Sequence, residues 1–68
     1  MNWDIVEGKW EQAKGHIKAK YADFTDDEID EAKANSQILA GKMQEKYGWS
    51  KEEADEKVAE LQDEISKM

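Results

Sequence analysis

Apolar side chains in the first third of the chain recur every three or four residues. They stand at Trp3, Val6, Trp10, Ala13, Ile17 and Tyr21. This spacing follows the 3.6-residue period of an α-helix and excludes the two-residue period of a strand. The pattern therefore predicts a helix over about residues 3–21 with one face in the core.

Two glycines, Gly8 and Gly15, lie on the opposite face of this expected helix. A glycine inside a helix costs up to about 1 kcal/mol relative to alanine, so something should offset each one. One interpretation is a surface position or a bend in the helix. The other is a close approach by a second helix or by the backbone of a partner.

Residues 41–50 carry the signals that end one helix and begin the next. Gly48 can take the positive φ that closes a helix, and Ser50 is a typical N-cap whose capping box Glu53 completes. The same signals occur 25 residues earlier, at Thr25 and Glu28. The apolar stripe also repeats after 26 residues, at Ile29, Ala32, Ser36, Leu39, Met43 and Tyr47. These repeats indicate two copies of a helical hairpin.

The segment between the two copies allows two interpretations. One helix could run over residues 26–47 with Ser36 facing inward, or a break at Ala34–Asn35 could start a new helix. We favour the break, because Asn and Ser compete for backbone hydrogen bonds and prefer caps. A break would also let Ile38, which is off the stripe, reach the core.

The expected fold is all-α, a single domain over residues 1–68. Only 10 of the 68 residues are Leu, Ile, Val or Phe, but three Trp, two Tyr and three Met add apolar surface. A domain of this size buries a small core, so we expect modest stability. After the first helix we expect helices over about residues 26–34, 36–47 and 51–66, the last buried along Ala54, Val58, Leu61 and Ile65.

The net charge is −7, and it is unevenly distributed. Residues 1–24 hold four acidic residues and four lysines, so the whole excess lies in residues 25–68. The chain also has no arginine. A nucleic-acid partner is therefore not expected, because phosphate binding needs a basic surface. No apolar run approaches the ~20 residues of a membrane span, and the start lacks the regions of a signal peptide, so we expect a cytoplasmic protein.

Residues for catalysis or metal binding are scarce. There is no cysteine, and the one histidine, His16, stands beside Lys14 and Lys18. A lone histidine among cations does not build a zinc site or a nucleophile–base pair, and we expect it to be a solvated surface residue. The sequence therefore predicts no enzyme, no metal and no cofactor.

Trp3 and Trp10 lie seven residues apart on one helix face. Tryptophans supply much of the burial energy of a small core, and this is the simplest interpretation. Tryptophan is also enriched at interface hot spots, and Trp3, close to the chain start, could be partly exposed to a partner. The candidate partner contacts are therefore Trp3, Gly8, Trp10 and Gly15. No sustained heptad supports self-association, so we expect a monomer.

The chain resembles the CsbD-like family of small bacterial stress-response proteins. The resemblance is carried by Glu7-Gly8-Lys9-Trp10, Gly15, Phe24-Thr25-Asp26-Asp27, Leu39, Gly41-Lys42, Gln44 and Tyr47-Gly48. It implies a compact four-helix domain of two crossed helical hairpins with approximate internal duplication. It also implies expression under general stress, no established biochemical activity and no catalytic residues.

Two hypotheses about function follow. The first is a non-enzymatic stress-response protein that acts by binding another macromolecule, in which case particular residues should matter. The alternative is a hydrophilin-like acidic protectant without a defined binding site, whose effect depends on hydration and abundance. The second predicts that scrambling the surface at fixed composition leaves protection intact.

Overall fold

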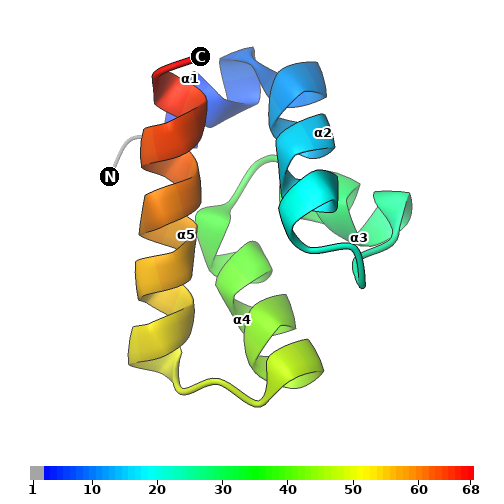
Figure 1. The fold of residues 1–68 in the computed structure, drawn as a ribbon, viewed down its shortest axis with the longest axis vertical. Coiled ribbons are helices and arrows are strands. Elements are labelled where there is room, and N and C mark those ends of the chain that lie inside the picture. The colour runs from blue at the N-terminus through cyan, green and yellow to red at the C-terminus, as the bar shows by residue number, and fades with distance from the viewer. Residues whose placement is uncertain (1–2) are drawn as a thin grey trace.

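The computed structural model describes residues 3–68 and contains five helices. They are α1 (Trp3–Gly8), α2 (Trp10–Lys20), α3 (Asp26–Glu31), α4 (Ser36–Tyr47) and α5 (Lys51–Ser66). Helices α4 and α5 form a long hairpin, α2 and α3 form a shorter one, and α1 packs against α5 near the C-terminus (Figure 1). The predicted all-α fold of two helical hairpins is confirmed.

The core is formed by the predicted apolar stripes. Every buried side chain among residues 3–68 is apolar. Helix α5 contributes the four residues that its spacing predicted. The fully or almost fully buried side chains of the stripes are Val6, Ala13, Ile17, Ile29, Ala32, Leu39, Met43, Ala54, Val58, Leu61 and Ile65. Trp10 and Tyr47 lie at the margin of this cluster, partly buried.

The first predicted helix is divided in two at Lys9. The backbone of Lys9 has φ −114° and ψ 34°, which lies outside the helical region, and Gly8 directly precedes it. The break lets α1 turn across α5 and bury Trp3 and Val6. Among the two interpretations of Gly8, a bend in the helix is therefore confirmed. A Cβ at this position would meet no atom within 4 Å, so no described helix approaches it closely.

The predicted break between α3 and α4 is confirmed, although α3 ends at Glu31 and not at residue 34. Asn35 caps α4 by accepting a hydrogen bond from the Gln37 backbone N–H at 2.8 Å. The expectation that the break would bury Ile38 is wrong, because this side chain is 40% exposed. Leu39 and Met43, on the stripe, fill the space instead.

The two helix joints meet at an aromatic cluster formed by Tyr21, Phe24, Tyr47 and Trp49. Tyr21 and Phe24 belong to the first joint. In the repeat, Tyr21 corresponds to Tyr47, and Phe24 corresponds to Trp49. The ring centroids of Tyr21 and Trp49 are 6.2 Å apart, and those of Phe24 and Tyr47 are also 6.2 Å apart. The repeat maps the first of these two pairs onto the second, and the two distances are equal. The internal duplication therefore extends to the packing of the aromatic rings.

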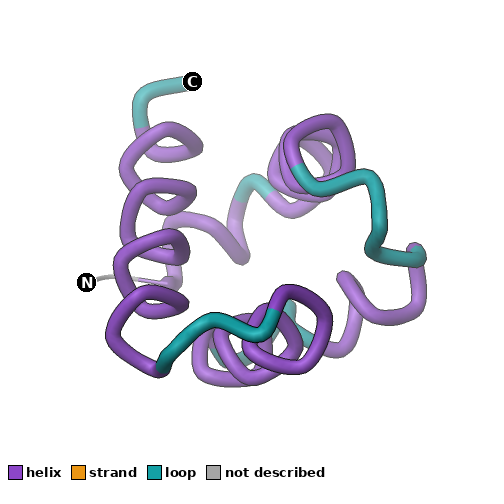
Figure 2. Tube along the Cα trace, turned by 60° about the horizontal axis from the view of Figure 1, so that its bottom comes forward, coloured by secondary structure: helices purple, strands orange, loops and turns teal. Residues whose placement is uncertain are grey.

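Both predicted N-caps are confirmed, but only the first forms a complete capping box. Thr25 and Glu28 form both bonds of the box, whereas at the second cap the structure gives only the bond from the Glu53 N–H to the Ser50 hydroxyl, at 3.1 Å. Gly48 ends α4 with φ 69°, and its N–H donates to Gln44 O. Figure 2 shows the resulting loops at the ends of the helices, with α3 closing the side of the molecule between α2 and α4.

Candidate partner surface

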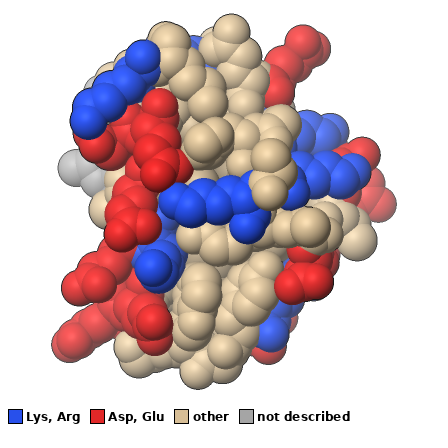
Figure 3. Space-filling view, in the orientation of Figure 1, with Lys and Arg blue, Asp and Glu red and all other residues tan. Residues whose placement is uncertain are grey.

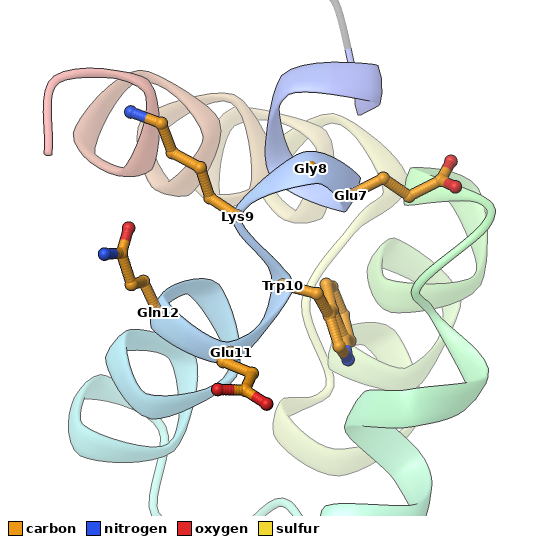
Figure 4. A pocket seen from close by; sticks show the side chains of 6 residues that line it. All are labelled: Glu7, Gly8, Lys9, Trp10, Glu11 and Gln12. Carbon is orange, nitrogen blue, oxygen red and sulfur yellow. The ribbon is translucent and has the colours of Figure 1, made fainter.

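A shallow open hollow lies at the break between α1 and α2. It has a volume of about 520 Å³ and is lined by residues 7–12. Gly8, which has no side chain, is one of the lining residues. Figure 4 shows the Lys9 side chain extending toward the end of α5, where its Nζ donates to Met68 O at 2.8 Å, while the Trp10 ring points to the other side.

Trp10 links this hollow to α3. Its indole Nε1–H donates to Asp30 Oδ1 at 3.1 Å, and Lys14 Nζ lies 3.3 Å from the same carboxylate. The hydrogen bonds from Trp10 and then Lys14 hold the pKa of Asp30 below its ordinary value. The indole is partly buried against the core.

Trp3 lies in a different environment from Trp10. Its side chain is 8% exposed, and its Nε1–H donates to Ala32 O at 3.0 Å and to Lys33 O at 2.9 Å. Two carbonyls that follow α3 thus share one donor. The expectation that Trp3 is partly exposed is wrong, and its role within the fold is to fix the turn after α3.

Gly15 lies on the open surface of α2. A Cβ there would meet no atom within 4 Å, and the same is true of Gly41, the corresponding residue of the repeat in α4. Both residues are inside helices, where glycine is unfavourable by about 1 kcal/mol relative to alanine. Packing within the described chain does not account for them.

His16 is not the isolated surface residue that the sequence predicts. Its Nε2 lies 2.6 Å from Glu64 Oε1, and Lys20 Nζ lies 3.0 Å from Glu64 Oε2. These contacts join α2 to α5. The hydrogen bonds of His16 and then Lys20 keep the pKa of Glu64 below its ordinary value. The partner is 48 residues away in the chain, so local spacing gave no signal for it.

Charged side chains are arranged differently on the two sides of the molecule. Acidic side chains run along the edge formed by α5, whereas lysines and acids alternate on the side where α3 lies (Figure 3). No three His, Cys, Asp or Glu side chains converge in a metal-binding arrangement within residues 3–68. No helix in this part of the chain is long and apolar enough to cross a bilayer.

Comparison with known proteins matches residues 4–56 to the CsbD-like family. UPF0337 protein PA4738 of Pseudomonas aeruginosa is 45% identical over 65 residues, which cover 96% of this chain and 100% of the relative. UPF0337 protein XAC4007 of Xanthomonas axonopodis pv. citri is 48% identical over 58 residues, 85% of this chain and 84% of the relative. A UPF0337 protein of Bordetella pertussis is 48% identical over 63 residues, 93% of this chain and 96% of the relative. No solved structure matches at a significant level. The chain therefore belongs to the CsbD-like family.

Proposed function

We propose that this protein is a non-enzymatic, cytoplasmic bacterial stress-response protein that acts as a monomer by binding another protein. The proposed contacts are Gly8 and Trp10, at the break between α1 and α2, and Gly15, on the exposed surface of α2. Trp3 contributes by holding the structure beneath this surface, because its indole is committed to the turn after α3. The family resemblance supports the stress-response role.

Gly15 carries the proposal. A glycine in the interior of an 11-residue helix lowers stability, and no side chain or backbone of the described fold needs the space that it leaves. A partner backbone approaching α2 closely would need that space. Trp10, at the start of the same helix and only partly buried, supplies the kind of side chain that contributes most at interface hot spots.

A hydrophilin-like protectant is the second candidate, and the composition favours it. Charged residues make up 40% of the chain, while every buried side chain in the described residues is apolar. The charge is therefore concentrated at the surface, where it binds water. In this case no individual surface residue should matter.

Bacterial survival under stress distinguishes the two candidates. We would compare a strain lacking the gene with strains carrying the wild type, Gly15→Gln, the matched control Gly41→Gln, and a chain with exposed residues scrambled at fixed composition. Glutamine is a good helix former, so both single variants should fold. Binding predicts loss of protection with Gly15→Gln and with the scramble only. Protection by all of these chains would contradict the proposal and support the protectant.

A further inference from the structure

Two glutamates line the hollow at the break between α1 and α2. Glu7, in the last turn of α1, is partly buried, and Glu11, in the first turn of α2, is exposed. Within residues 3–68 neither side chain makes a hydrogen bond or an ion pair. The hollow therefore carries two carboxylates whose charge the fold does not balance.

The lysines near the hollow are engaged elsewhere. Lys9 Nζ donates to Met68 O at 2.8 Å, so its side chain extends toward the end of α5 and away from both glutamates (Figure 4). Ion pairs with acidic residues of α3 or α5 also engage five lysines of the neighbouring helices, Lys14, Lys18 and Lys20 of α2 and Lys42 and Lys46 of α4. Although residues 1–24 hold equal numbers of acidic residues and lysines, the charge at the hollow is therefore negative.

Trp10 lines the same hollow, and in the view of Figure 4 its ring lies between the side chains of Glu7 and Glu11. The ring is only partly buried. In the aromatic cluster, by contrast, lysines stand over three rings at 5.4 to 6.0 Å from the ring centroids. Among residues 3–68 no lysine stands over Trp10 in this way. The fold therefore supplies no cation to this indole.

The orientation of the indole is fixed before a partner binds. Its Nε1–H donates to Asp30 Oδ1 at 3.1 Å, and Lys14 holds the same carboxylate. A ring that is already oriented loses less conformational freedom on binding. Gly8, beside the ring, has no side chain, so the backbone of a partner can approach the hollow closely.

These features together match one kind of side chain. An aromatic face attracts a cation, and tryptophan attracts it most strongly. A guanidinium group is planar, stacks on aromatic rings and donates several N–H groups to carboxylates, whereas an ammonium group does not stack in this way. Tryptophan and arginine are also the residues most enriched at interface hot spots. A partly exposed indole beside two unpaired carboxylates is therefore complementary to arginine.

We propose that the hollow receives an arginine side chain of the protein partner, with the guanidinium stacked on the Trp10 ring and its N–H groups donating to the Glu7 and Glu11 carboxylates. The inference rests on the proposed function and names the chemistry of the partner at the same contacts. The net charge of −7 favours the same class of partner, because it attracts a basic segment at long range.

The experiment uses the full ¹⁵N-labelled chain and a short blocked peptide, acetyl-Gly-Gly-Arg-Gly-Gly-amide. Matched peptides carry lysine or citrulline, which has the shape of arginine without its charge. Glu7→Gln/Glu11→Gln removes both carboxylates of the hollow. The control, Glu52→Gln/Glu56→Gln, removes the same charge from the exposed side of α5. None of these four side chains makes an ion pair within residues 3–68, so both variants should fold.

The arginine peptide should shift the Trp10 indole N–H and the Gly8 amide. It should bind the wild type and the control equally, and bind Glu7→Gln/Glu11→Gln about fivefold more weakly. The lysine and citrulline peptides should bind the wild type more weakly than the arginine peptide does, and added salt should weaken the binding of arginine. Several results would overturn the proposal: no shift at either signal, equal affinity for the wild type and Glu7→Gln/Glu11→Gln, or equal affinity for the citrulline peptide.

Bacterial survival under stress separates failure of this inference from failure of the proposed function. Glu7→Gln/Glu11→Gln should lose protection together with Gly15→Gln, while Glu52→Gln/Glu56→Gln should keep it. If only Gly15→Gln loses protection, the binding surface stands and the arginine is wrong. If both variants keep protection, the binding surface is wrong as well.

Discussion

Replacing each of the first two tryptophans by phenylalanine should have unequal effects on stability, because their indole N–H groups serve different acceptors. Trp3 donates to Ala32 O and Lys33 O within the fold, whereas Trp10 donates to an exposed carboxylate of Asp30. The substitution keeps an aromatic ring in both places. The comparison therefore isolates the donor and its surroundings.

The magnitude for Trp3→Phe follows from its contacts. Ala32 O loses the indole donor but keeps the Asn35 backbone N–H at 3.2 Å, so the lost hydrogen bond costs about 0.5–1.5 kcal/mol. The smaller ring adds roughly 1 kcal/mol of lost packing. Lys33 O is only partly buried, so water can replace that bond. We expect a loss of about 1.5–2.5 kcal/mol in the free energy of unfolding.

Urea unfolding followed by far-ultraviolet circular dichroism measures this difference without depending on tryptophan fluorescence. For a chain of 68 residues the slope is about 1 kcal/mol per molar urea, so Trp3→Phe should lower the midpoint by roughly 2 M. Trp10→Phe should shift the midpoint by less than half as much, because water and Lys14 still satisfy Asp30. Equal shifts would refute the assignment of Trp3 as the residue that fixes the turn after α3.

Three further predictions test the helix ends, the glycines and the charges. Ser50→Ala should lower the free energy of unfolding by about 1 kcal/mol, because α5 loses its N-cap. Ser66→Ala, in the last turn of α5, should change it by almost nothing. Equal urea midpoints for the two variants would contradict the role of Ser50 as a cap. Gly15→Ala and Gly41→Ala should each raise the free energy of unfolding by about 0.5–1 kcal/mol, because both glycines lie inside helices with open space around them. Gly48→Ala should lower it by about 1 kcal/mol, because the φ of Gly48 is 69°. Thermal melts that show the same sign for all three variants would contradict this prediction. The folded-state pKa of Glu64 is depressed, so its contribution to stability is present above its unfolded pKa of about 4.5 and is lost as the pH falls through the folded value. Glu64→Gln should therefore flatten the decline in the free energy of unfolding below about pH 4.5. An unchanged decline would show that the His16 and Lys20 contacts do not contribute to stability.

Most of the fold was predictable because its signals are local. The caps at Thr25 and Ser50 and the positive φ of Gly48 depend on residues within four positions of one another. The buried edge of α5 follows from its spacing alone. A strong local signal and the tertiary structure agree at each of these places.

The break at Lys9 was not predictable from the stripe. The spacing of Trp3, Val6 and Trp10 is that of a continuous helix, and it is unchanged across the break. The bend depends on α1 packing against α5, at the far end of the chain. Gly8 was the one local signal, and it allowed a surface position equally well.

The candidate surface was predicted only in part, because its contacts join distant segments. The Glu64 partner of His16 and the ion pairs around α3 depend on which helices become neighbours. One signal for these ion pairs was present in the sequence: an acidic run at residues 26–31 lies between two pairs of lysines, each four residues apart. The sequence alone could not show that these residues pair, because the pairing depends on α2 and α4 lying on either side of α3.

We propose that this domain binds a partner through Gly8, Trp10 and Gly15 of α1 and α2. The most direct measurement is a ¹⁵N–¹H NMR spectrum of labelled protein, alone and then in lysate from stressed bacteria, with Gly15→Gln measured in parallel. We expect dispersed signals in which Gly8, Trp10 and Gly15 shift or broaden together in lysate, and no such change in the variant. Signals that remain unmoved in lysate, or that change identically in the variant, would contradict a binding surface at this position.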